Sequence, residues 1–153
     1  MKKTNIQEEL MMKKLFSLLL TLSLILVLAG CSSEKKPGIT FVNGLDQTWD
    51  NLYISIETDE EWGDSVISAV VNPGGKVRVD MDKFTENIAA GVYDIGVICH
   101  NNMNYDVYGV TLADGYEVKF TSTGNTENDT LTVSVTDTEG KVTTYQGYIY
   151  ANE

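Results

Sequence analysis

The stretch Asn72-Pro73-Gly74-Gly75-Lys76-Val77-Arg78-Val79-Asp80-Met81-Asp82 decides the fold class. It begins with a turn, because proline fixes φ at a turn position and glycine supplies the left-handed backbone that follows. The next seven residues alternate polar and apolar side chains, which is the period of a strand with one buried face. We therefore predict that Val77, Val79 and Met81 face the core and that the charged residues between them face solvent.

The same two signals, alternation and turn residues, recur along the chain from residue 39 onward. Strands are predicted over residues 39–42, 51–57, 76–82, 92–100, 105–112, 116–122, 131–136 and 142–150. Turns are predicted at Asn43-Gly44, at residues 101–104, at the hairpin pair Asp114-Gly115 and at residues 137–140. Eight short strands with turns at such spacing indicate an antiparallel sandwich or barrel, and we expect an all-β, antiparallel β-sandwich of about eight strands.

Three segments carry more specific expectations. In residues 51–57, Leu52, Ile54 and Ile56 are predicted to share one face of a strand, because they follow a period of two. Residues 65–71 are apolar without a clear period, so they are a short strand or an irregular turn. Residues 84–90 hold the one candidate for a helical turn downstream of the leader.

A leader precedes the strands. Lys13-Lys14 are followed by a Leu-rich apolar run and then by Leu28-Ala29-Gly30-Cys31, which is the order of a secretory signal. This order resembles a bacterial lipoprotein signal, in which the tetrapeptide is the lipobox. The resemblance implies cleavage before Cys31, acylation of its thiol and attachment to the cell membrane through the acyl chains. A transmembrane anchor is the alternative, but a span needs about 20 apolar residues and this run is shorter.

The leader divides the chain into three parts. Residues 1–30 are predicted to be the signal peptide, with translation starting at Met11 or Met12 because Glu8 and Glu9 dilute the positive charge before the apolar run. Residues 31–38 are the lipidated cysteine and a flexible tether, and residues 39–153 are the β domain. The expected location is the extracytoplasmic side of the cell membrane.

Charge excludes one class of partner. After removal of residues 1–30 the chain holds seven basic and 20 acidic residues, a net charge of −13. Nucleic-acid binding needs clustered lysine and arginine to neutralise phosphates, so we expect no nucleic-acid partner.

Catalytic motifs are sparse. His100 is the only histidine, which argues against Ser-His-Asp relays and multi-histidine metal sites. Its neighbour Cys99 cannot reach it, because adjacent residues on a strand point to opposite faces. We predict a buried, inert Cys99 and a surface His100, and no catalytic residue or cofactor. If Cys31 carries lipid, Cys99 has no partner for a disulfide within the chain.

The acidic loop of residues 59–64, Asp-Glu-Glu-Trp-Gly-Asp, is the one candidate metal site. Oxygen-rich loops closed by glycine bind Ca²⁺, but this spacing does not match an EF-hand and Trp62 interrupts it. A solvated loop is the favoured interpretation, and no metal ligand is predicted.

The aromatic residues bear on the kind of partner. A row of exposed aromatics on a sheet would suit a glycan or a protein ligand. Tyr148 and Tyr150 share one face of their strand and Tyr145 lies on the other, which favours ordinary packing. We therefore expect a lipid-anchored, non-enzymatic binding or interaction module. A small carbohydrate-active or other hydrolase using acidic residues, or a purely structural envelope component, is the alternative.

Six short motifs follow one another between residue 39 and about residue 120. They are Asn43-Gly44, Leu-Tyr-Ile-Ser at 52–55, Trp62-Gly63, Pro-Gly-Gly at 73–75, Tyr-Asp-Ile at 93–95 and Tyr-Gly-Val-Thr-Leu at 108–112. Their order resembles a small β-sandwich module of bacterial secreted proteins and lipoproteins. That module has no established activity, so the resemblance implies the fold and no site residues.

Overall fold

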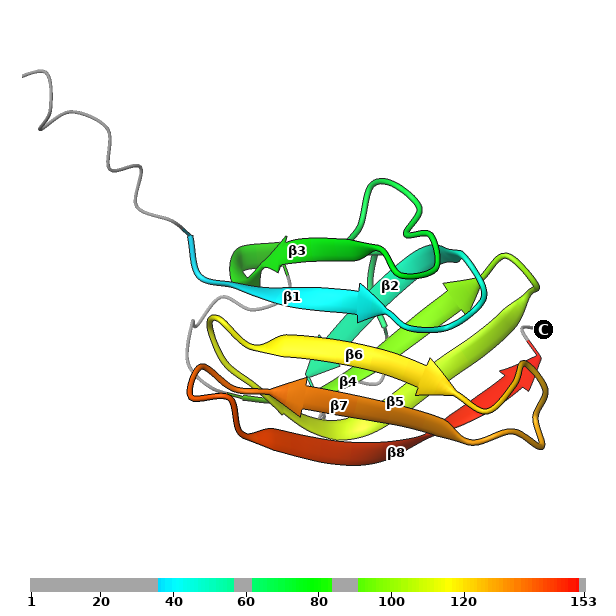
Figure 1. Ribbon diagram of the computed structural model, residues 1–153. Helices are drawn as coiled ribbons and strands as arrows, with labels where there is room; N and C mark the ends of the chain where they lie inside the picture. Colours follow the sequence, from blue (N-terminus) through cyan, green and yellow to red (C-terminus); the bar gives the residue numbers. More distant parts are fainter. Residues whose placement is uncertain (1–35, 57–61, 84–90, 152–153) are drawn as a thin grey trace, which may run out of the picture. The chain divides into compact units, whose positions relative to one another are not determined.

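The computed structural model describes residues 36–56, 62–83 and 91–151, and these residues form an all-β domain (Figure 1). The strands are β1 (Gly38–Asn43), β2 (Trp49–Ile56), β3 (Lys76–Asp80), β4 (Gly91–Cys99), β5 (Met103–Leu112), β6 (Glu117–Ser122), β7 (Leu131–Thr136) and β8 (Val142–Ala151), with a short 3-10 helix η1 (Met81–Lys83) after β3. All eight predicted strands are present, and all of their bounds lie within two residues of the prediction.

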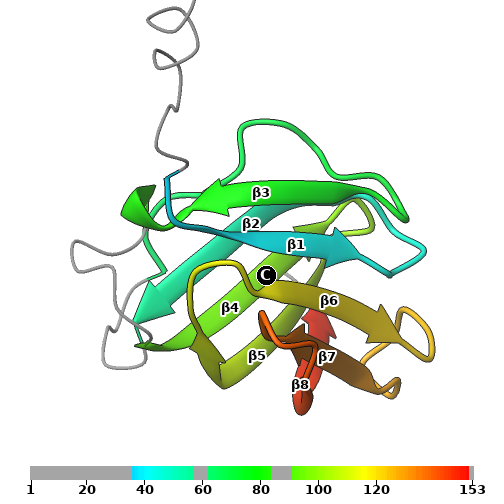
Figure 2. The ribbon, with the colours of Figure 1, turned by 60° about the vertical axis from the view of Figure 1, so that its left-hand side comes forward.

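The eight strands form one continuous sheet in the order β2-β4-β5-β8-β7-β6-β1-β3. The sheet curls into a half-barrel, and Figures 1 and 2 show β1, β3, β6 and β7 on one side of the curl and β2, β4 and β5 on the other. A sandwich of two separate sheets is not confirmed, because β8 pairs with both β7 and β5 and so joins the two sides. The sheet is also mixed rather than antiparallel, since β1 and β6 run parallel.

The sheet turns its corner at Gly147. Residues 142–147 of β8 pair with β7, ending at Gly147 opposite Leu131, and residues 148–151 pair with β5. A Cβ on Gly147 would lie 2.5 Å from the carbonyl oxygen of Asp106 and 2.5 Å from the Cδ2 atom of Leu131. Only glycine fits between the two neighbouring strands, so this residue lets β8 pass from one half of the sheet to the other.

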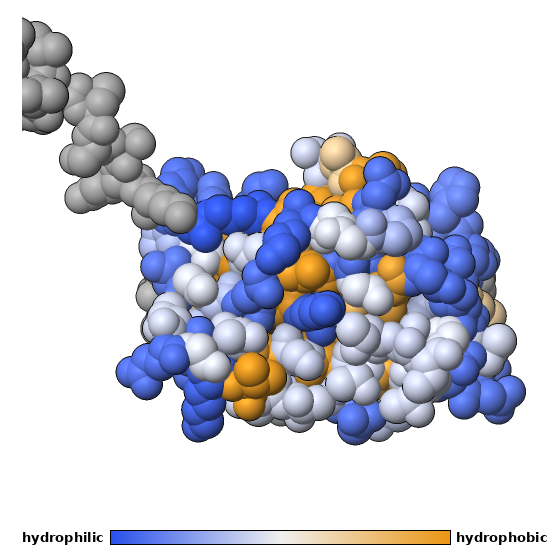
Figure 3. All heavy atoms as spheres, viewed as in Figure 1, coloured by the Kyte–Doolittle hydropathy of each residue, from blue (hydrophilic) through white to orange (hydrophobic). Residues whose placement is uncertain are grey.

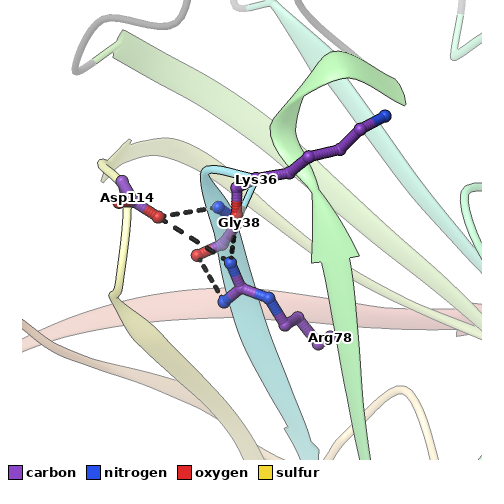
Figure 4. A network of polar contacts seen from close by, with 4 residues as sticks. All are labelled: Lys36, Gly38, Arg78 and Asp114. Carbon is purple, nitrogen blue, oxygen red and sulfur yellow. Dashed lines mark hydrogen bonds and ion pairs between the residues drawn. The ribbon is translucent and has the colours of Figure 1, made fainter. Parts of the chain in front are cut away.

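Asp114-Gly115 is a turn but not the predicted hairpin. Gly115 has a φ of +80°, as the turn requires, yet β5 and β6 do not pair. The turn instead carries the chain across the curl and closes on the start of β1 (Figure 4). The Asp114 carboxylate accepts the amide of Gly38 at 2.7 Å, and Arg78 donates to the carbonyls of Gly38 at 3.1 Å and Lys36 at 2.6 Å. The first residues of β1 are therefore fastened to both β3 and the β5–β6 turn.

The core lies inside the curl. Its largest fully buried side chains include Trp49, Tyr105, Phe41 and Phe120, and the Trp49 and Phe120 rings meet edge to face with centroids 5.4 Å apart. Among the described residues, the indole N–H of Trp49 is a buried donor without a hydrogen-bond partner. Figure 3 shows that polar and neutral residues cover most of the face turned to the viewer, which agrees with a core enclosed by the sheet.

Inward alternation is mostly as predicted. Val79 and Met81 are buried and Val77 is partly buried against the core, although β3 ends at Asp80 and Met81 begins the 3-10 helix. In β2, Leu52 and Ile54 are buried, whereas Ile56, the last residue of the strand, is 40% exposed.

Other expectations concern less regular parts of the chain. Residues 65–71 are irregular, with a single bridge from Val71 to Trp49. The candidate helical turn at 84–90 and the leader with Cys31 lie outside the described residues. In the part that the structure describes, no helix is long and apolar enough to cross a membrane.

Candidate ligand-binding site

The outer surface of β2, β4, β5 and β8 carries one aligned row of residues. The strand register places Tyr53 beside Gly96, Gly96 beside Asp106, and Asp106 beside Tyr148. Because side chains alternate along a strand, all four residues lie on the face turned away from the core. The row therefore sets one carboxylate between a glycine and a tyrosine on an outer face of the sheet.

Asp106 is buried although it lies on the outer face, with 4% of its surface exposed. Tyrosine rings cover it: the hydroxyls of Tyr108, at 3.3 Å, and of Tyr150 both donate to its Oδ2 atom. Burial raises the pKa of Asp106, and this effect exceeds the opposing effect of the two hydroxyl donors. Burial also raises the pKa values of Tyr108 and Tyr150, so both phenols stay protonated and act as donors at neutral pH.

Gly96 makes room for a tryptophan. A Cβ on Gly96 would lie 3.3 Å from the Trp62 ring and 2.9 Å from the Oδ1 atom of Asp106, so the ring rests over the bare glycine next to the carboxylate. The Trp62 and Tyr108 ring centroids are 6.2 Å apart, and those of Tyr108 and Tyr148 are 5.9 Å apart. Such tilted contacts are typical of attractive aromatic pairs.

We call this surface the aromatic face. It consists of Tyr53, Trp62, Tyr108, Tyr148 and Tyr150 around Asp106. Three of its tyrosines are among the exposed large hydrophobic side chains of the described domain: Tyr148 is 62% exposed, Tyr108 48% and Tyr150 37%. A cluster of exposed tyrosine rings around a buried acid is unusual on the surface of a protein and marks a candidate binding site.

A pocket of about 180 Å³ opens on the aromatic face. The rings of Tyr53, Trp62 and Tyr150 line it together with the strand around Gly96 and the polar side chains of Asn104 and Asp106. Asp106 is the one acidic residue among the described residues that line the pocket.

A second hollow, of about 310 Å³, lies near the β7–β8 turn. Its polar groups already serve the fold: the Asp137 carboxylate accepts the backbone amides of Glu139 and Lys141, and the Tyr145 hydroxyl accepts the amide of Thr111. This hollow is therefore the weaker candidate.

Cys99 and His100 lie as predicted. Cys99 ends β4 and is 1% exposed, and burial raises the pKa of its thiol to about 12. His100 is exposed, and its Nδ1 atom lies 3.3 Å from a carboxylate oxygen of Asp50. The two residues therefore do not form a thiol–imidazole pair.

The acidic loop is described only in part. Residues 59–61 lie outside the described residues, and Trp62 belongs to the aromatic face. Within the residues that the structure describes, no group of three or more histidine, cysteine, aspartate or glutamate side chains is placed to hold a metal ion.

Sequence reasoning did not find the aromatic face. Tyr145 does lie on the opposite side of β8 from Tyr148 and Tyr150, but ordinary packing does not describe Tyr148, whose ring is mostly exposed. The sequence signal of this face was the spacing of Tyr148 and Tyr150, which puts both on one side of their strand. Trp62 and Asp106 come to lie beside them only through the pairing of strands that are distant in the sequence.

Comparison of the chain with protein-family models, with curated proteins and with solved structures finds no match. The case for a function therefore rests on the aromatic face and on the sequence of the leader.

Proposed function

We propose that this protein is a lipid-anchored, extracytoplasmic module that binds a ligand on its aromatic face and does not catalyse a reaction. The observation that carries the proposal is the cluster of half-buried Trp62 and exposed Tyr108 and Tyr148 beside the pocket. Leaving large aromatic rings in water forgoes the free energy of burying them, so such a cluster is best explained by a partner that covers it.

The rings are held in place before any ligand arrives. Trp62 rests over Gly96, and the hydroxyls of Tyr108 and Tyr150 are fixed by the Asp106 carboxylate. Side chains that are already ordered lose little entropy on binding, which raises affinity. A buried acid that orients two exposed rings therefore supports binding as the role of this surface.

The same geometry argues against the hydrolase alternative. Glycoside hydrolysis uses two carboxyl groups on either side of the scissile bond, roughly 5–10 Å apart. Asp106 is the only carboxylate among the described residues lining the pocket, and its Oδ2 atom already accepts two hydroxyls. The nearby Asp94 accepts the backbone amide of Gly109 at 2.9 Å, which is a structural role. No observation specifically favours a purely structural envelope component.

Membrane attachment rests on the lipobox, Leu28-Ala29-Gly30-Cys31. Because Cys31 carries the acyl chains in this proposal, Cys31→Ser is expected to abolish incorporation of labelled fatty acid and partition into detergent. Cys99→Ser is the matched control and is expected to leave labelling unchanged, since the buried thiol takes no lipid. Labelled fatty acid on the Cys31→Ser chain would refute the lipobox assignment.

Binding is tested with the acylated protein in detergent micelles, labelled with 5-fluorotryptophan. The chain has two tryptophans: Trp62 reports on the aromatic face, and Trp49 is fully buried and serves as an internal reference. A panel of small amines, monosaccharides and short peptides is expected to include compounds that shift the Trp62 resonance and leave that of Trp49 in place. The shift should be lost in Tyr150→Ala and kept in Tyr145→Phe, and a panel without such a compound contradicts the proposal.

A further inference from the structure

The groups that line the pocket define the chemistry of its ligand, given the proposed function on which this inference rests. We propose that the pocket between Tyr53, Trp62 and Tyr150 binds an alkylammonium cation, with the Asp106 carboxylate as its counter-charge. Four features of the pocket favour such a ligand: its rings, its hydrogen-bonding groups, its charge and its size.

The rings supply a surface suited to a cation. Tyr53 comes from β2, Trp62 from the segment that follows it and Tyr150 from β8, so three aromatic side chains reach one pocket from separate parts of the chain. The face of an aromatic ring carries partial negative charge and attracts a cation within about 6 Å of its centroid. Tryptophan gives the strongest such attraction of the aromatic residues.

The tyrosine hydroxyl groups beside the pocket can act toward a ligand only as hydrogen-bond acceptors. Tyr108 and Tyr150 each give their single proton to the Oδ2 atom of Asp106. A phenol that has donated its proton offers only oxygen lone pairs to a ligand. These groups, with the carboxylate itself, favour a ligand that donates hydrogen bonds or carries positive charge, and they disfavour an anion.

Within the described part of the chain, the negative charge at the pocket has no basic partner. Among the described residues, no lysine or arginine lines the pocket. The Lys and Arg ion pairs, such as Lys76–Glu117 and Arg78–Asp114, involve residues of β3, β6, η1, the β5–β6 turn and the segment before β1. Asp94 adds negative charge close enough to raise the pKa of Asp106. A buried carboxylate without a counter-ion is costly, so a cationic ligand gains more here than a neutral one.

The size of the pocket favours a single small group. Its volume of about 180 Å³ is below the range of about 300–1,000 Å³ that is typical of small-molecule sites. A sugar is the competing ligand, because sugars also stack on aromatic rings. A neutral sugar would leave the charge of Asp106 uncompensated, whereas an ammonium group both compensates the charge and fits between the rings.

The test uses pairs of probes that differ in charge and hardly in shape. Choline is compared with 3,3-dimethylbutan-1-ol, and n-butylammonium with n-butanol, on the acylated fluorotryptophan protein in neutral detergent. We expect a saturable shift of the Trp62 resonance with each cation, at least tenfold weaker binding of each neutral isostere, and no shift of Trp49. Affinity should rise with pH as Asp106 loses its proton, because the ionised carboxylate is the form that attracts the cation.

Two variants assign the charge preference to the pocket. Asp106→Asn is expected to weaken choline binding at least tenfold and to remove its pH dependence, while Asp80→Asn, which removes the same charge on β3, leaves both unchanged. Tyr53→Leu removes one ring without touching Asp106 and is expected to weaken choline several-fold, which keeps the test available if Asp106→Asn fails to fold.

The outcomes separate this inference from the proposed function. Equal binding of a cation and its isostere, or full binding by a folded Asp106→Asn chain, overturns the cation assignment and leaves the aromatic face as a binding surface. A shift of the Trp62 resonance with methyl glucoside and none with the cations also overturns the cation assignment, and it identifies a sugar as the ligand of the aromatic face. If neither cation moves Trp62, the inference is wrong, and the wider panel decides the proposed function separately.

Discussion

Replacing Gly147 by alanine should strongly destabilise the domain. The added Cβ would lie 2.5 Å both from the Asp106 carbonyl oxygen and from Leu131 Cδ2, and real Cβ atoms essentially never approach within 3.0 Å. Leu131 has rotamers with which to move. The carbonyl does not, because Asp106 is held within β5 between β4 and β8.

The size of the effect follows from these two contacts. Overpacking a closely packed site costs typically 1–3 kcal/mol, and a rigid backbone atom on one side places this substitution at the upper end, about 3 kcal/mol. For a domain of about 115 residues this corresponds to roughly 4 °C in Tm per kcal/mol, or about 12 °C in all. If β5 and β8 separated to relieve this contact, the pairing of residues 103–106 with 148–151 would break. The tyrosines of β8 would then leave the aromatic face, and the domain would lose stability as well.

Urea unfolding followed by circular dichroism measures the loss, with an unchanged m-value as the sign that the unfolded state is the same. Gly140→Ala is the matched control, because Gly140 has a φ of +85° and open space around it. Its cost is conformational, about 1 kcal/mol. The reasoning about the corner is wrong if Gly147→Ala costs no more than Gly140→Ala.

Three further predictions concern buried polar groups. Burial raises the folded-state pKa of Asp106 above its unfolded value of about 3.9. Its contribution to the stability of the domain is therefore complete below the unfolded pKa, and this contribution is lost as the pH rises through the folded pKa. Asp106→Asn should remove this decline of stability with pH, as measured by urea unfolding between pH 3 and 8. Parallel curves of stability against pH for the unchanged chain and the variant would contradict the prediction. Cys99, with a pKa of about 12 and almost no exposed surface, should react with iodoacetamide at pH 7 only after urea is added, and rapid alkylation of the folded chain would disprove this. Trp49→Phe should cost about 1 kcal/mol or less, because the loss of ring volume is offset by removal of a buried N–H without a partner, whereas Phe120→Ala across the same contact should cost about 3–5 kcal/mol in the same assay.

Local patterns were enough to find the strands. The alternation of residues 131–136 predicts β7 with its observed bounds, because its apolar side chains alternate with half-buried polar ones. Pairing was less accessible, since it depends on residues far apart in the chain. Asp114-Gly115 has the turn chemistry of a hairpin, but β6 pairs with β1 and β7, and β5 with β4 and β8. The turn residues specify a reversal and do not say which strand lies beside the next.

The candidate site illustrates the same limit. The sequence places Tyr148 and Tyr150 on one face of a strand, which is correct, since residues two apart on a strand share a face. Asp106 comes to lie beside them through the β5–β8 register, and Trp62 through its contact with Gly96. Neither contact can be predicted from residues close together in the sequence. That an acid on the outer face is buried can be recognised only when the positions of both neighbouring strands are known.

The fastening of Gly38 by Arg78 and Asp114 has a mechanical consequence. In a lipid-anchored protein, any drag on the bound ligand is balanced at the membrane, and this tension enters the domain at the start of β1. β1 is bonded on one side to β3 and on the other to β6, so a pull along its axis loads two rows of hydrogen bonds in shear instead of opening them one by one. Resistance to such a pull is set by the rate of unfolding under load. If the protein is anchored through Cys31 as proposed, the contacts of Arg78 and Asp114 lie where the load arrives and reinforce the end of β1 that bears it.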